Sequence, residues 1–250
     1  MDDAKRRTLA VGLGAILSAT ASAGKAATPN RYKAAVFDGF PIFDVRPIGV
    51  RTESYFPGKG AALTLLWRTR QFEYQWLSSL MNRYVDFTKA TEQSLDFASN
   101  AMGLSLTTEM RDSLVGMYQS LGVWPDVPGA LKTLRDRGLR LGMLSNMTQN
   151  MLDRGLSASG VSSSFEHVLS TDTIRSYKPS PISYQLAVDQ FHLQPSEILF
   201  VPFAGWDAAG AKSFGYPTYW INRIDAPAEV LGYAPDGAGK QMSDLLAYLG

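Results

Sequence analysis

Short apolar runs alternate with segments of helical spacing along most of the chain. The runs that predict buried strands lie at 34–37, 139–144, 167–170, 198–201 and 218–221. Between them, apolar residues recur every three or four positions, which predicts helices at 129–137, 149–158, 180–191 and 207–214. This alternation is typical of β–α units, so we expect an α/β fold with a parallel sheet.

The stretch 61–121 differs because it has helical spacing and no strand pattern. Its apolar and aromatic positions step by three or four from Leu66 through Phe72 and Trp76 to Tyr84, which predicts one long amphipathic helix. Two further helices are expected at 91–102 and 107–121. The pattern therefore predicts a core formed by 31–46 and 123–250, with an inserted helical cap at 47–122.

The amino end is typical of an export signal. Arg6 and Arg7 precede a short apolar segment rich in Gly and Ala, and small residues follow up to Ala23. The apolar segment is shorter than the roughly 20 residues of a membrane-spanning helix. We expect residues 1–26 to be a twin-arginine-like signal peptide, which would make the protein periplasmic or secreted.

Composition excludes several classes of function. A formal net charge of +1, from 24 basic and 23 acidic residues, gives no basic surface for nucleic acid. The chain has no Cys and two His, so cysteine-ligated metal sites and three-histidine sites are ruled out. We expect chemistry based on carboxylates, Lys, Arg and hydroxyl groups, with no metal, no other cofactor and no stable insertion into a membrane.

Polar residues follow the predicted strands at their carboxyl ends. Asp38 follows the first strand, Ser145 and Asn146 follow the second, Lys178 lies after the third and Asp207 after the fourth. In open parallel sheets, ligands bind outside the carboxyl ends of the strands. These side chains are therefore expected to meet at one site.

The same residues lie in sequence motifs of a known family. Over roughly residues 32–250 the chain resembles the haloacid dehalogenase superfamily, and within it the type II 2-haloacid dehalogenases. The resemblance rests on Val36-Phe37-Asp38, Leu144-Ser145-Asn146, Tyr177-Lys178-Pro179, Trp206-Asp207-Ala208-Ala209-Gly210 and the cap segment Trp67-Arg68. It implies a Rossmann-like core with a helical cap.

The resemblance also implies a reaction: hydrolysis of short-chain 2-haloalkanoic acids to 2-hydroxy acids through an ester on the nucleophile Asp38. Lys178 would orient Asp38, Arg68 would receive the halide, and Asp207 would activate water. The small anionic substrate would be bound by Phe40, Phe72, Phe87, Ser145, Asn146, Tyr184 and Trp206. Related enzymes are often homodimers joined partly through the long cap helix, and the pattern around Trp76-Leu77 and Leu80-Met81 would suit such an interface.

Three departures from the family motifs leave alternatives open. The family's Asp-x-x-Gly-Thr is replaced by Asp38-Gly39-Phe40-Pro41-Ile42, and the Ser and Asn before Trp206 are replaced by Pro202 and Ala204. Thr69 stands where Gln is common, and Phe72 where Leu is. One alternative is a slow or non-catalytic protein that binds small organic acids. A magnesium-dependent phosphatase is the other, disfavoured because Phe40 occupies the position of its acid.

Overall fold

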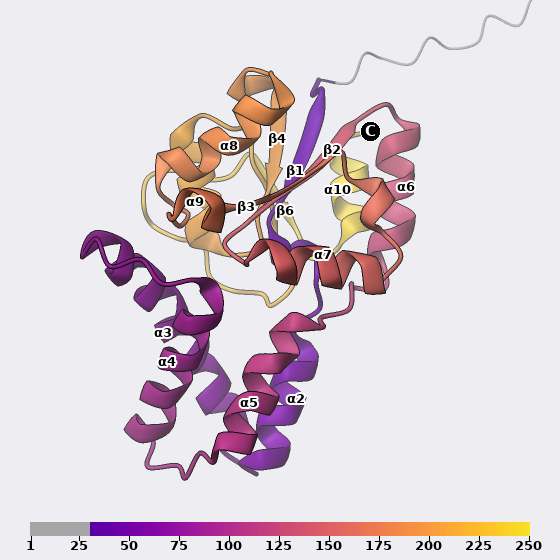
Figure 1. Cartoon of the computed structure of the whole chain (residues 1–250). Coiled ribbons are helices and arrows are strands. Elements are labelled where there is room, and N and C mark those ends of the chain that lie inside the picture. The colour runs from indigo at the N-terminus through magenta and orange to yellow at the C-terminus, as the bar shows by residue number, and fades with distance from the viewer. Residues whose placement is uncertain (1–30) are drawn as a thin grey trace, which may run out of the picture.

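The computed structural model describes residues 31–250, so the predicted signal peptide at 1–26 lies outside the described residues. The chain forms an α/β core with a separate group of helices below it (Figure 1). None of the helices in the described part is long and apolar enough to cross a membrane.

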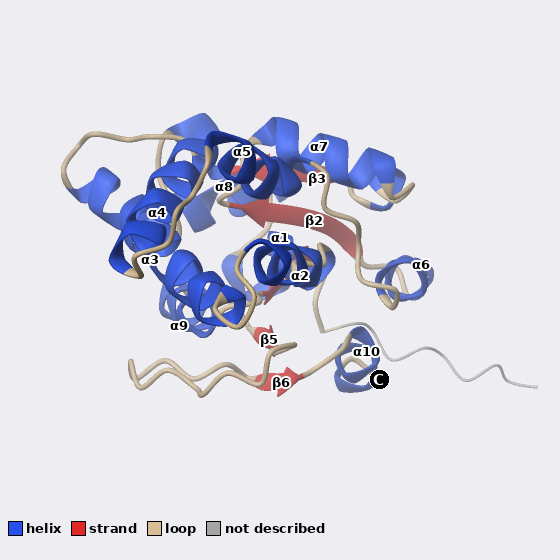
Figure 2. Ribbon diagram, turned by 90° about the horizontal axis from the view of Figure 1, so that it is seen from below, coloured by secondary structure: helices blue, strands red, loops and turns tan. Residues whose placement is uncertain are grey.

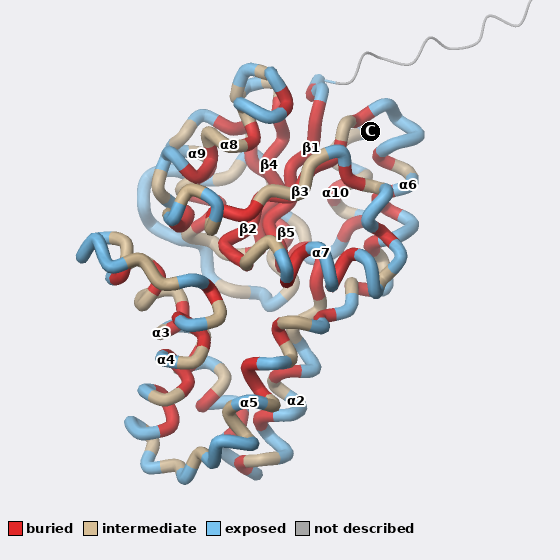
Figure 3. Tube along the Cα trace, viewed as in Figure 1, coloured by how far each residue is buried: buried red, intermediate tan, exposed pale blue. Residues whose placement is uncertain are grey.

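Four parallel strands make the central sheet. They are β1 (Ala34–Phe37), β2 (Arg140–Ser145), β3 (His167–Ser170) and β4 (Ile198–Val201), in the order β3-β2-β1-β4. β1 lies between β2 and β4, with Val36 opposite Gly142 on one side and Phe200 on the other. Every residue of β1 and β4 is buried, as expected of strands covered on both faces (Figure 3).

Alternate residues of the strands enter two separate apolar clusters. Ala35 and Phe37 pack in a cluster with α6 (Val127–Asp136), α7 (Gln149–Ala158) and α10 (Met242–Tyr248). Ala34 and Val36 point the other way, toward α8 (Pro181–Phe191) and α9 (Gly205–Phe214). The sheet is therefore the middle of three layers.

The sheet differs from the expected one at its edge. β5 (Tyr219–Ile221) was predicted as a fifth strand, but it pairs in parallel with β6 (Gly237–Gly239) in a separate two-stranded sheet. A single bridge between Phe200 and Thr218 joins it to β4. The remaining short elements are α1 (Gly39–Ile42), η1 (Met117–Gln119), η2 (Ser162–Ser164), η3 (Thr171–Ile174) and η4 (Pro195–Glu197).

The helices inserted between β1 and β2 form the cap. They are α2 (Arg46–Tyr55), α3 (Gly60–Leu80), α4 (Phe87–Ala101) and α5 (Thr108–Gly116). The sequence pattern predicted that the long helix extends to Tyr84, but α3 ends at Leu80. Asn82 has a positive φ of 55°, a left-handed conformation that cannot continue a right-handed helix. Figures 1 and 2 show these helices grouped beyond the strand ends, so the predicted fold of a parallel α/β core with a helical cap is confirmed.

The cap and core also touch along one side of the site. Tyr84 donates a hydrogen bond to Asp172, and the Tyr177 hydroxyl donates to the carbonyl of Val85 at 2.7 Å. Trp76 of α3 donates to the carbonyl oxygen of Lys178 at 3.0 Å. The segment between β3 and α8 is therefore held by the cap as well as by the core.

Candidate active site

Asp38 is the first residue after β1 and the N-cap of the one-turn helix α1. One carboxylate oxygen accepts a hydrogen bond from the backbone N–H of Phe40 at 3.3 Å. The other accepts from the Lys178 ammonium at 2.8 Å. The next residue must be small, because a Cβ at Gly39 would lie 2.8 Å from the hydroxyl oxygen of Ser145. The turn therefore brings the carboxylate beside the end of β2.

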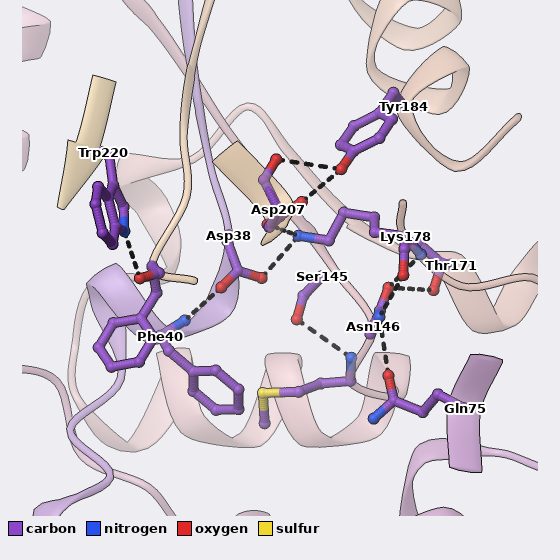
Figure 4. A network of polar contacts seen from close by, with 12 residues as sticks. Asp38, Phe40, Gln75, Ser145, Asn146, Thr171, Lys178, Tyr184, Asp207 and Trp220 are labelled. Carbon is purple, nitrogen blue, oxygen red and sulfur yellow. Dashed lines mark hydrogen bonds and ion pairs between the residues drawn. The ribbon is translucent and has the colours of Figure 1, made fainter. Parts of the chain in front are cut away.

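Lys178 is shared between two carboxylates. Its Nζ lies 2.8 Å from an oxygen of Asp38 and 2.6 Å from an oxygen of Asp207, and none of the three side chains is more than 11% exposed (Figure 4). Burial lowers the pKa of Lys178, but attraction to Asp207 and Asp38 outweighs this effect and raises it. The lysine therefore stays charged.

Asp207 carries the most perturbed carboxyl of the site. Its second oxygen accepts a hydrogen bond from the Tyr184 hydroxyl at 2.7 Å. Burial raises the pKa of Asp207 to about 6, with repulsion from Asp38 acting in the same direction and attraction to Lys178 opposing both. One ammonium therefore does not fully compensate two buried carboxylates.

Asn146 connects the strand ends to the cap. Its side-chain oxygen accepts from the backbone N–H of Lys178 at 2.9 Å and from the Thr171 hydroxyl at 3.2 Å. Its amide nitrogen donates to the side-chain oxygen of Gln75 at 2.9 Å (Figure 4). Gln75 lies on α3 and was not predicted as a residue of the site. The signal that could have found it is its spacing of seven residues from Arg68, which places both on one side of a helix.

Seven of the predicted residues line one small cavity at the nucleophile. Its walls are Asp38, Ser145 and Asn146 with the aromatic side chains of Phe40, Phe72, Phe87 and Trp206, and Ala204 completes them. The cavity measures about 10 Å³, the lower limit of the roughly 10–15 Å³ that one water molecule requires. A substrate therefore enters only when part of the wall moves.

Phe72 and Trp206 separate this cavity from a larger hollow of about 1300 Å³ outside it. Their ring centroids lie 5.1 Å apart in an edge-to-face contact, and Trp76 packs on Trp206 at 5.3 Å. The hollow lies between α2 and α3 of the cap and the segments 203–206 and 224–229 of the core. Phe72, Ala204 and Trp206 line both the hollow and the cavity, so these side chains stand between the two.

Arg68 borders the outer hollow and not the inner cavity. Its guanidinium lies 5.4 Å from the centre of the Phe203 ring, a cation–π contact. Burial lowers the pKa of Arg68, although a guanidinium stays protonated in proteins. Among residues 31–250 no carboxylate forms an ion pair with it.

Three other predicted residues, Lys178, Tyr184 and Asp207, also lie away from the cavity wall. Tyr184 was expected to bind substrate, but it is fully buried against Phe200 and Tyr216, and its hydroxyl bonds to Asp207. Asp207 is 1% exposed and sits behind Lys178. Tyr184 and Asp207 therefore lie near the strand ends, as expected, but behind the cavity wall.

Pro202 and Ala204, which replace the Ser and Asn of the family motif before Trp206, leave this side of the site apolar. Pro202 has no side-chain donor, and Ala204 contributes only a methyl group to the cavity. Across residues 31–250, no group of three His, Asp or Glu side chains could hold a metal ion.

Comparisons with known proteins place these observations in a family. Residues 25–215 match the haloacid dehalogenase-like hydrolases. The (S)-2-haloacid dehalogenase of Pseudomonas sp. strain YL is 43% identical over 195 residues, which cover 78% of this chain and 84% of that protein. Haloacetate dehalogenase H-2 of Moraxella sp. strain B is 39% identical, with 83% of this chain and 93% of that protein covered.

A solved structure agrees with the sequence relatives. The L-2-haloacid dehalogenase of Xanthobacter autotrophicus with covalently bound chloropropionic acid superposes with a TM-score of 0.77 at 32% identity, covering 86% of this chain and 96% of that one. Its fold is that of a parallel core with a helical cap, as seen here. The chain therefore belongs to the haloacid dehalogenase-like hydrolases.

Proposed function

We propose that the protein hydrolyses the carbon–halogen bond of short (S)-2-haloalkanoic acids and releases 2-hydroxy acids and halide. Its sequence relatives are (S)-2-haloacid dehalogenases at 34–43% identity, which makes it a hydrolase acting on carbon–halide bonds. The observation that carries the reaction is the Asp38 carboxylate, bonded to Lys178 at 2.8 Å and facing an aromatic cavity.

In the first step an oxygen of Asp38 attacks the carbon that bears the halogen. The carbon–oxygen bond of an ester forms as the carbon–halogen bond breaks, and the bonding pair leaves with the halide. Lys178 holds the Asp38 carboxylate in position through their 2.8 Å ion pair, and the aromatic wall removes the water that would otherwise solvate the nucleophile. Arg68 receives the halide when the cap brings the guanidinium to the cavity.

In the second step water attacks the carbonyl carbon of the ester. Asp207 accepts one proton of the water, and the bond between that carbon and the ester oxygen breaks as the departing alkoxide takes this proton back to become the 2-hydroxy acid. Asp38 is regenerated with a water-derived oxygen and loses the second proton to solvent. A pKa of about 6 leaves Asp207 ionised at neutral pH and able to act as a base. Because its two oxygens bond to Lys178 and Tyr184, the water must approach beside these groups.

The test is a single turnover in ¹⁸O-labelled water with excess protein over (S)-2-chloropropionate. The mechanism predicts unlabelled lactate from the first turnover and one heavy oxygen in the peptide that contains Asp38. An Asp38→Asn variant is the control and should release no halide. Labelled lactate in the first turnover would mean that water attacks the substrate directly.

A second possibility is a protein that stalls at the ester. It is favoured by the apolar Pro202 and Ala204 where the family carries Ser and Asn, and by the fully bonded Asp207. Mixing the protein with substrate then releases one halide per active site rapidly and further halide slowly. Mass spectrometry would find a persistent adduct on Asp38.

We also propose that two copies associate through the outer face of α3. At the end of this helix Leu77, Leu80 and Met81 are 47%, 79% and 62% exposed. Together they form an exposed apolar patch, the kind of surface that marks a protein–protein interface. Trp76, expected to share this surface, is half-buried and bonds to Lys178. Light scattering of the unaltered protein and of a Leu80→Asp variant tests for a dimer that the substitution weakens.

Export is a further proposal, based on the sequence of residues 1–26. Cell fractionation of the full chain should find the protein outside the cytoplasm. If residues 1–26 are a twin-arginine signal, replacing Arg6 and Arg7 with Lys should leave the protein in the cytoplasm.

A further inference from the structure

Gln75 has a buried amide donor without a partner. Its side chain is 0% exposed, and its Nε2 makes no hydrogen bond with any residue from 31 to 250. Leaving a buried donor unsatisfied costs roughly 1–3 kcal/mol. Such a group in a folded protein requires an explanation, and a bound ligand is one.

The orientation of this amide is fixed by its neighbour. The Asn146 oxygen accepts from Lys178 and Thr171, so the Asn146 nitrogen is the donor that faces Gln75. Gln75 must therefore present its oxygen to Asn146 and its nitrogen elsewhere. Turning the amide over would bring two donors together and lose the 2.9 Å bond.

The Gln75 amide is one hydrogen bond away from the wall of the nucleophile's cavity. Asn146, to which Gln75 is bonded, lines that cavity together with Asp38 and Ser145. In Figure 4 the Gln75 side chain lies beside Asn146, with its oxygen facing Asn146 and its nitrogen on the other side of the amide. Ser145 accepts from the backbone of Met147, which leaves its hydroxyl proton available for a ligand.

Gln75 also shares a helix face with two residues of the site. Seven residues correspond to about two turns, so Gln75 points in nearly the same direction as Arg68, about 10 Å further along α3. Phe72 lies between them and lines the cavity. The helix thus offers a cation at one end of this face and a neutral donor at the other.

We propose that Gln75 Nε2 donates a hydrogen bond to the carboxylate of the substrate and thereby contributes to the selection of acids. This rests on the proposed dehalogenase function. The carboxylate takes Nε2 and the Ser145 hydroxyl as donors, while the halogen is directed toward Arg68. The cap therefore recognises both substituents of the reacting carbon from one helix.

The test measures binding in the unreactive Asp38→Asn background by calorimetry. The two probes are (S)-2-chloropropionate and its neutral amide. Adding Gln75→Glu keeps the oxygen that Asn146 requires but replaces the donor with a negative charge. We expect Kd for the acid to rise at least tenfold, which corresponds to about 1.4 kcal/mol, and Kd for the amide to change less than twofold.

A second variant covers the case in which a buried Glu prevents folding. Gln75→Met is neutral and of similar length, and it should also weaken binding of the acid more than binding of the amide. The matched control is Gln93→Glu, at an exposed position on α4, which should change neither Kd. Equal losses for both probes, or no loss for the acid, would overturn the proposal.

The readout separates this inference from the proposed function. Halide release by the unaltered protein tests the reaction, whereas the ratio of the two Kd values tests the contact with the carboxylate. If the unaltered protein releases no halide but the Gln75→Glu change causes the tenfold loss of binding for the acid alone, the dehalogenase function is refuted and the carboxylate contact stands.

Discussion

Removing the charge of Lys178 should destabilise the protein strongly, in a way that depends on pH. A Lys178→Met change leaves Asp38 and Asp207, 8% and 1% exposed, without their shared cation. Breaking a buried pair by removing one partner costs about 3–5 kcal/mol. For a protein of this size each kcal/mol lowers Tm by roughly 2–4 °C, so a fall of roughly 6–20 °C is expected at pH 7.

Lowering the pH should recover part of this loss. The native pKa of Asp207 is already raised to about 6 from an ordinary value of 3.8, so the folded protein takes up a proton more readily than the unfolded chain. The protonated carboxyl of Asp207 contributes its full stabilisation at a pH below 3.8, the pKa of Asp207 in the unfolded chain. This contribution disappears as the pH rises through about 6, the pKa in the folded protein. Without Lys178 the pKa rises further, because the attraction that lowers it is gone.

Urea unfolding at pH 7 and pH 5 measures both effects. The control is Lys132→Met, which removes a cation from an exposed pair with Asp136 and should cost at most about 1 kcal/mol at either pH. A Lys178→Met variant no less stable than this control, or one whose deficit does not shrink at pH 5, would refute the account of a cation shared by two buried carboxylates.

Three further outcomes follow from the site. Turnover should fall as the pH drops through about 6, because protonated Asp207 cannot accept a proton from water, and measuring lactate release from pH 5 to 8 checks this. Ala204→Asn should speed steady-state halide release about fivefold if one added hydrogen bond of about 1 kcal/mol holds the water; an unchanged rate would exclude a water beside residue 204. Arg68→Met should slow the initial halide burst by about 10²–10³-fold in rapid-mixing experiments, and an unchanged burst would show that the halide leaves elsewhere.

The sequence predicted the layers of the fold well because both signals on which they depend are local. Strands buried on both faces appear as short apolar runs, and α7 and β3 have the predicted ends. The end of α3 and the separate pairing of β5 were missed. The first depends on the backbone conformation of Asn82, and the second on pairing with a short Gly-rich strand at 237–239.

The candidate site was predictable to the level of the strand ends. Asp38, Ser145 and Lys178 follow from topology, since the carboxyl ends of parallel strands meet at one edge. Which side chains face the cavity depends on packing: Tyr184 turned out to support Asp207, and Gln75 gained its position from the approach of the cap. Neither fact is encoded in local spacing.

The contact between Arg68 and Phe203 has a consequence for the salt in which the protein works. A cation–π contact does not neutralise the positive charge of the Arg68 guanidinium. A small anion that enters the outer hollow can therefore bind to this guanidinium. Chloride is both a product of the reaction and a common ion of natural media. The apparent affinity for substrate should therefore weaken as chloride rises, and the enzyme would slow as its own product accumulates.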